Sequence, residues 1–145
     1  MDFDADSRGR MLIDTHCHLV HPPLDVVAEE ALTRAQEAGV RRCLTVGVDE
    51  DSSRANIELA QRYSQLRAAV GVHPHDADGV TDKVLAEIER LSSEPKVAAI
   101  REVGLDHYRR NSSPGNQRRV FVDFMKMAQR RNLPLVIHCR NAYEE

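Results

Sequence analysis

Long apolar runs are absent from this chain of 145 residues. No segment approaches the roughly 18 consecutive apolar residues that indicate a membrane-spanning helix. The first eight residues, MDFDADSR, are acidic and lack the apolar stretch of a secretory signal peptide. Both absences argue against a membrane or secreted protein, so we expect a globular cytoplasmic protein that has no membrane partner.

Cysteine is scarce as well. The chain has three cysteines, Cys17, Cys43 and Cys139, and none belongs to a Cys-x-x-Cys pair. This pattern argues against a disulfide framework and against a zinc site made of thiolates alone. We interpret all three as reduced, mostly buried side chains. Cys139 could still contribute to a metal site beside His138, although neighbouring residues of a strand point to opposite faces.

The net charge of the chain is small, but charged residues of the two signs are unevenly distributed along it. Residues 1–100 contain 11 basic and 18 acidic side chains, whereas residues 101–145 contain 9 basic and 5 acidic ones, which gives net charges of −7 and +4. Arginine offers planar, bidentate donors to phosphate groups. The basic part is therefore compatible with a phosphate-bearing substrate, although charged runs usually lie on solvated faces.

Short apolar segments alternate with helical patterns along the chain. The apolar segments predict five strands, at residues 11–14, 42–46, 67–72, 97–101 and 133–138. The intervening helices are predicted to begin near Pro22, Asp51, Thr81 and Pro114. Such a series calls for parallel strands that are joined by right-handed crossovers.

Two α/β folds contain such a series. A doubly wound sheet usually has a glycine-rich turn after its first strand, but here that turn holds His16 and His18. In a (β/α)8 TIM barrel the chemistry lies at the C-terminal ends of the strands, which is where this chain places its histidines and carboxylates. We therefore predict a TIM barrel truncated to about five parallel strands and four or more helices. Residues 1–10 would be a tail, and residues 11–145 the N-terminal part of the barrel.

Histidine spacing indicates a metal site. In an extended chain His16 and His18 share one face, and imidazole is a common ligand of zinc and similar ions. They could instead be partly buried polar residues at a strand end. A carboxylate at Glu102, directly after a buried strand, is costly unless it is paired or metal-bound. His138 also ends a buried strand, and together these four residues are the predicted metal ligands. His73 lies in a tight loop, where it could simply satisfy backbone groups.

Four segments in order, IDTHCHL, GVHPHDA, EVGLDHYR and PLVIHCRNA, resemble the TatD family of metal-dependent hydrolases, a branch of the amidohydrolase superfamily. The resemblance spans nearly all of residues 11–145. It implies a metal-binding barrel and a deoxyribonuclease-like activity that hydrolyses phosphodiester bonds of DNA in the manner of a 3′-5′ exonuclease.

The resemblance also implies a two-metal centre with zinc, manganese or magnesium. His16, His18 and Glu102 would bind one divalent ion, and Glu102 and His138 would bind the other, so that Glu102 bridges them as the catalytic carboxylate. Two ions can activate a water molecule and stabilise the leaving oxygen during in-line attack on a phosphodiester. The implied substrate-binding residues are His73, Asp106 and Arg140.

Two features depart from the family pattern. Arg101 stands where the family commonly has glycine before the bridging glutamate, and family barrels run to about 250 residues with further metal ligands in later strands. We therefore expect a fragment with little activity of its own, or a chain that completes its barrel with a second copy or a separate C-terminal half. The remaining alternatives are hydrolysis of a non-nucleic amide or ester, and a non-catalytic metal-binding or scaffold domain.

Overall fold

The computed structural model describes residues 11–144. Its strands are β1 (Leu12–Cys17), β2 (Val40–Val46), β3 (Leu66–Val70), β4 (Val97–Asp106) and β5 (Leu135–Arg140). The connecting helices are α1 (Ala28–Glu37), α2 (Glu50–Arg62), α3 (Asp82–Leu91) and α4 (Pro114–Arg131), with a short 3-10 helix at Pro74–Gly79 after β3.

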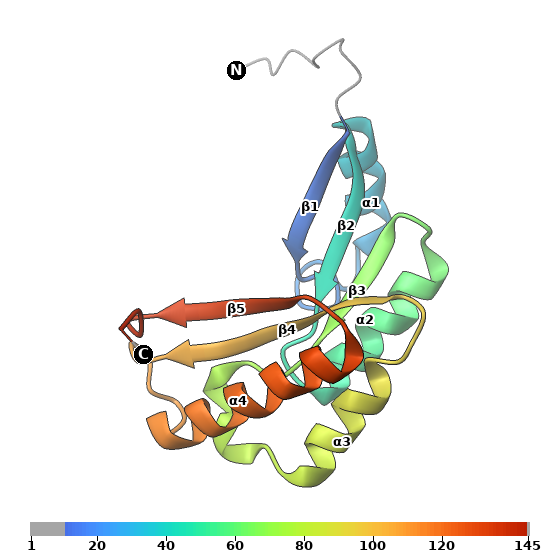
Figure 1. Ribbon diagram of the computed structural model, residues 1–145. Helices are drawn as coiled ribbons and strands as arrows, with labels where there is room; N and C mark the ends of the chain where they lie inside the picture. The colour runs from blue at the N-terminus through green and yellow to red at the C-terminus, as the bar shows by residue number, and fades with distance from the viewer. Residues whose placement is uncertain (1–10, 145) are drawn as a thin grey trace.

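The five strands form one parallel sheet in the order of the sequence, β1-β2-β3-β4-β5. Figure 1 shows that the sheet turns strongly from β1 to β5 and that the helices lie along its outer side. Consecutive parallel strands with helices on the outside are the arrangement of a (β/α)8 barrel. The described chain is therefore a half-barrel, as predicted, and the carboxyl ends of its strands meet at one edge.

Capping residues explain where three of the helices begin. The side chain of Asp49 accepts from the backbone N–H of Ser52, and the two residues form a reciprocal capping box at α2, two positions before the expected start. Thr81 caps α3 as predicted, and Ser113 caps α4 ahead of a proline at its first position. Helix α4 ends at Asn132, whose φ of 51° is left-handed.

Three other boundaries differ from the sequence prediction by three residues or more, while the ends of β2, β3 and β5 differ by at most two. Helix α1 begins at Ala28 because residues 21–27 form turns instead of continuing the helix from Pro22. Strand β1 continues to Cys17, which pairs with Thr45 of β2. Strand β4 continues to Asp106 because β5 pairs with it along its second half. Several predicted site residues consequently lie within strands and not in the loops after them.

The core lies between the sheet and the helices, where Phe124 of α4, Ile88 of α3 and Ile100 of β4 are fully buried. The edge strands are less covered, since Leu12, Ile13 and Ile137 are each more than half exposed. The sheet therefore packs most tightly around β3 and β4, the two strands next to the candidate site. None of the helices in residues 11–144 combines the length and apolar character needed to cross a membrane.

Candidate metal centre

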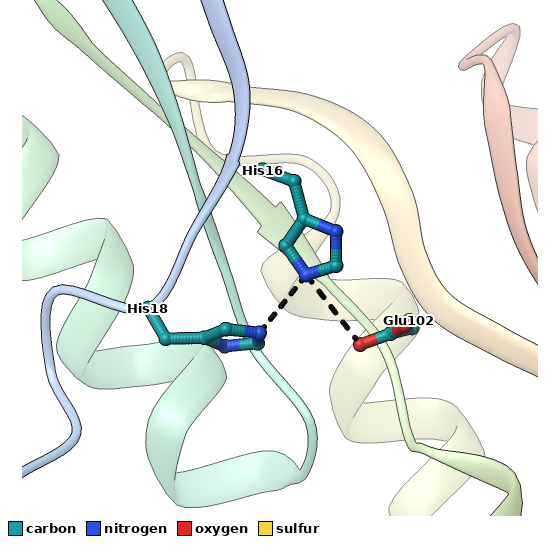
Figure 2. A group of neighbouring side chains, drawn as sticks. All are labelled: His16, His18 and Glu102. Atoms are coloured by element: carbon teal, nitrogen blue, oxygen red, sulfur yellow. Dashed lines mark hydrogen bonds and ion pairs between the residues drawn. The ribbon is translucent and has the colours of Figure 1, made fainter.

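The first group of candidate ligands consists of His16, His18 and Glu102, which Figure 2 shows pointing toward one another. The Nε2 atoms of His16 and His18 are 2.9 Å apart, and His16 Nε2 lies 3.8 Å from Glu102 Oε2. Cys17 points away, and its thiol donates to the carbonyl of Leu44 at 3.4 Å. Burial raises the pKa of Cys17 to about 12, so this thiol stays protonated and is not available as a thiolate ligand.

A second group consists of His73, Glu102 and His138, whose ligand atoms all lie within 4.8 Å of one another. Glu102 belongs to both groups, and its Oε1 lies 3.3 Å from Nδ1 of His138. The strand order explains this meeting, because His73 follows β3 and His138 lies on β5, the two neighbours of β4. The structure thus brings together all four residues that were predicted as ligands, and adds His73, which was predicted for the substrate pocket.

Gly104 sets the distance between β4 and β5 beside His138. The two residues are register partners, and Gly104 has a φ of 140°. A Cβ at this position would collide with the backbone of His138. Only glycine combines this backbone conformation with so close an approach, which places the His138 side chain next to Glu102.

Asp106 is fully buried and accepts four hydrogen bonds. Its Oδ2 accepts from Nε2 of His75 at 2.8 Å and from Nε2 of His138 at 3.1 Å, while Oδ1 accepts from the backbone N–H groups of Tyr108 and Arg109 at 3.0 and 2.8 Å. Burial acts to raise the pKa of Asp106, but these hydrogen bonds lower it well below its usual range. The carboxylate is therefore ionised and has no free oxygen for the substrate contact that the sequence predicted.

The Asp106 carboxylate fixes the proton of His138. Because an ionised carboxylate only accepts, neutral His138 carries its proton on Nε2 and keeps a lone pair on Nδ1. In the neutral ring that lone pair faces Glu102 Oε1 at 3.3 Å, so no imidazole hydrogen lies between the two atoms. Ligands at about 2.0–2.2 Å from a zinc ion lie about 3.0–3.6 Å from each other. The pair thus fits a shared cation, and a carboxylate behind the imidazole is the usual support of a metal-binding histidine.

His73 has a different proton arrangement. Its Nδ1 accepts from the backbone N–H of His75 at 3.2 Å, so the neutral ring carries its proton on Nε2. Burial, followed by the nearby His138 and His75, lowers the pKa of His73 to about 4. At neutral pH its side chain is consequently an uncharged hydrogen-bond donor, and its ring centre lies 4.6 Å from that of His138.

Arg101 lies against the first group. The residue is only 7% exposed, and its guanidinium donates to the carbonyl of Thr15 at 3.0 Å and also contacts Nδ1 of His16. Burial and the charge of Arg101 both lower the pKa of His16. His16 is therefore neutral at pH 7, the state in which imidazole binds metal ions.

Arg140 and Tyr108 lie at the rim of the same strand ends. The Arg140 guanidinium carbon is 3.9 Å from the centre of the Tyr108 ring, a cation-π contact, and the tyrosine is 59% exposed. Arg140 was predicted from the sequence, whereas Tyr108 was not. The available signal was its place two residues after Asp106, at the end of a strand whose neighbours carry candidate ligands.

Comparisons with known proteins point to one family. A family described as "TatD related DNase" matches residues 13–145. The metal-dependent hydrolase YabD of Bacillus subtilis, itself called uncharacterized, is 39% identical over 135 residues, which are 93% of this chain and 53% of that protein. A "3'-5' ssDNA/RNA exonuclease TatD" of Cronobacter turicensis is 35% identical over 91% of this chain and 50% of its own length.

Among solved structures, YJJV, a TatD homolog from Escherichia coli K12, superimposes with a TM-score of 0.86 at 30% identity. The match covers 92% of this chain and 52% of that one. The chain therefore spans about half the length of the relatives it matches.

Proposed function

Since the chain belongs to the family of TatD-related DNases, we propose that its centre hydrolyses phosphodiester bonds of DNA or RNA with the help of divalent metal ions. One observation carries this proposal: two groups of candidate ligands share a single carboxylate, Glu102. Separate polar residues at strand ends would not require such sharing. A two-metal hydrolytic centre does, because both ions must lie close to the same phosphate.

The roles follow from the two groups. His16, His18 and Glu102 would hold one ion, and Glu102 and His138 would hold the other. Ions bound there would activate a water molecule and stabilise negative charge on the phosphate. The mixed nitrogen and oxygen donors suit zinc, manganese or magnesium to different degrees. Asp106 would act behind His138 as a positioning residue.

The substrate would be bound by groups at the rim of the centre. His73 offers its Nε2 proton to a phosphate oxygen, and Arg140 offers the planar fork of its guanidinium. Tyr108 holds that guanidinium over its ring and exposes much of the remaining side chain. Stacking of a base on an aromatic ring is typical of single-stranded nucleic-acid binding. The name of the Cronobacter relative, a single-strand exonuclease, supports the same substrate class.

Small p-nitrophenyl esters test which class of bond the chain hydrolyses, and they do not require the chain to bind a nucleic acid. Because the chain spans about half the length of its relatives, we expect only slow hydrolysis of bis(p-nitrophenyl) phosphate at high protein concentration, in a manganese-dependent reaction that Glu102→Gln abolishes. The matched control is Glu58→Gln, which alters an exposed carboxylate of α2. Faster hydrolysis of p-nitrophenyl acetate, also lost in Glu102→Gln, would instead assign an esterase. Metal binding without either reaction would leave a non-catalytic metal-binding domain and contradict the proposal.

A labelled oligonucleotide then tests the substrate. Binding of a single-stranded oligonucleotide, measured by fluorescence anisotropy in the absence of metal ions, should exceed binding of the same sequence as a duplex. Arg140→Gln should weaken the single-strand binding. Equal affinity for the single strand and the duplex, or unchanged binding in Arg140→Gln, would show that Arg140 and its surroundings do not bind the substrate.

A further inference from the structure

Arg101 is a buried cation directly beside a candidate ligand. It precedes Glu102 in β4, and its guanidinium makes two contacts across the sheet, to the Thr15 carbonyl and to Nδ1 of His16. Within the described residues its buried Nε has no hydrogen-bond partner. A guanidinium that only filled space in the core would be expected to have all of its buried donors satisfied. This one leaves a donor unsatisfied and directs another at the imidazole.

The contact with His16 determines where that imidazole carries its proton. A guanidinium has donors and no acceptor, so the nitrogen that it contacts must offer a lone pair. Neutral His16 then carries its proton on Nε2. This is the atom that lies 2.9 Å from His18 Nε2 and 3.8 Å from Glu102 Oε2, inside the first group. In this tautomer Nε2 donates a hydrogen bond and has no lone pair for an ion.

We propose that Arg101 holds His16 in the tautomer that cannot bind an ion through Nε2, so that the first group accepts a metal only after the guanidinium leaves Nδ1. The inference rests on the proposed function, which makes His16 a ligand. Metal-binding histidines usually donate from their second nitrogen to an acceptor. His16 has the reverse arrangement, because its second nitrogen faces a donor.

His138 provides the internal comparison. Its Nε2 donates to Asp106, so the nitrogen that faces Glu102 already has a free lone pair. The His138–Glu102 pair of the second group is thus set for an ion, whereas the first group is set against one. Two ions consequently bind in order, with the second group filled first, and Arg101 weakens the affinity of the first group specifically.

Nitrogen NMR of the imidazole rings tests the proposal on the metal-free chain. Long-range ¹H-¹⁵N spectra should show the proton of His16 on Nε2, and titration with zinc alone should move it to Nδ1 as the first group fills. His138 should keep its proton on Nε2 throughout. In Arg101→Leu, which removes the donor, metal-free His16 should lose its preference for the Nε2 proton.

Calorimetry with zinc measures the consequence for affinity. Arg101→Leu should tighten the weaker of the two zinc sites by about 10- to 100-fold, the effect of removing one hydrogen bond to a charged group. Arg62→Leu removes the same charge from the end of α2, outside both groups, and should leave that affinity unchanged. If Arg101→Leu raised the zinc affinity but left the tautomer of metal-free His16 unchanged, the cause would be the lost positive charge alone. That result would overturn the proposal.

Two further outcomes would also overturn it: a proton on Nδ1 of His16 in the metal-free wild type, or unchanged zinc affinity in a folded Arg101→Leu variant. Should that variant not fold, the wild-type spectra and Arg101→Met, which also removes every donor, decide the question by the same criteria. Failure of the proposed function looks different, because the wild type would then either bind no zinc or bind zinc without hydrolysing bis(p-nitrophenyl) phosphate. If zinc does not bind, the affinity prediction fails too, while the tautomer of metal-free His16 still shows whether Arg101 acts on it.

Discussion

Replacing Asp106 with asparagine should disable His138 as a ligand while the ring stays in place. Asparagine can keep its oxygen at the backbone N–H groups of Tyr108 and Arg109, which donate to Oδ1 in the native chain. Its amide nitrogen then takes the position of Oδ2 and faces Nε2 of His75 and His138. Because this nitrogen only donates, each imidazole must present a lone pair at Nε2 and carry its proton on Nδ1.

For His138, the displaced proton would lie between Nδ1 and Glu102 Oε1, which are 3.3 Å apart. The lone pair that an ion needs is then used in a hydrogen bond. Loss of the group that orients a metal-binding histidine typically costs about 10- to 100-fold in metal affinity. We expect zinc binding at the second group to weaken by that factor in Asp106→Asn, as measured by calorimetry at pH 7.

The same substitution has a stability cost that the structure bounds. Four hydrogen bonds to a charged acceptor become bonds to a neutral amide, each weakened from roughly 2 to 1 kcal/mol, so the loss is at most about 4 kcal/mol. A domain of ordinary stability, about 5–15 kcal/mol, would still fold. Asp51→Asn, on an exposed carboxylate of α2, is the matched control. Unchanged zinc affinity in a folded Asp106→Asn variant would refute the tautomer argument.

Three other predictions concern the strand contact, pH and the rim. Gly104→Ala should lower the free energy of unfolding in urea by at least about 1–3 kcal/mol, because Gly104 has a left-handed backbone conformation and lies against the backbone of His138. An unchanged urea midpoint of unfolding would contradict this close approach. Hydrogen bonds from Arg90 and Arg54 lower the pKa of Glu87 to about 2, so its carboxylate should stabilise the fold above its ordinary pKa of 4.5. That contribution is lost as the pH falls from about 4.5 to about 2, so the urea midpoints of wild type and Glu87→Gln should converge there; a constant difference would refute it. Tyr108→Ala should weaken single-strand binding more than Tyr108→Phe, and equal losses would exclude stacking.

The fold class could be predicted from the sequence because local signals agree with the global arrangement. Apolar segments alternate with helical patterns, and Thr81 and Pro114 mark helix starts that the structure contains. The convergence of His16, His18, Glu102 and His138 could also be predicted, since parallel strands bring their carboxyl ends to one edge. Their part in metal binding stays a prediction.

Other features depend on contacts between distant segments. The contacts of Asp106 with His75 and His138 and the contact of Arg101 with His16 leave no local pattern, because these partners lie 31, 32 and 85 residues away in the sequence. The length of β1 was underestimated for the same reason, since its last pairing is with Thr45 of β2. Turn geometry likewise moved the start of α1 from Pro22 to Ala28.

In the proposed centre one carboxylate, Glu102, serves two metal ions. Zinc binds four-ligand peptide sites with about 10–16 kcal/mol, so each ligand contributes about 2.5–4 kcal/mol and its loss weakens binding about 100-fold or more. Calorimetric titration of the metal-free chain with zinc should therefore show two binding events in the wild type and in Glu58→Gln, and both events should weaken by that factor in Glu102→Gln. Loss of only one event, or unchanged zinc binding in a folded Glu102→Gln variant, would contradict a shared carboxylate.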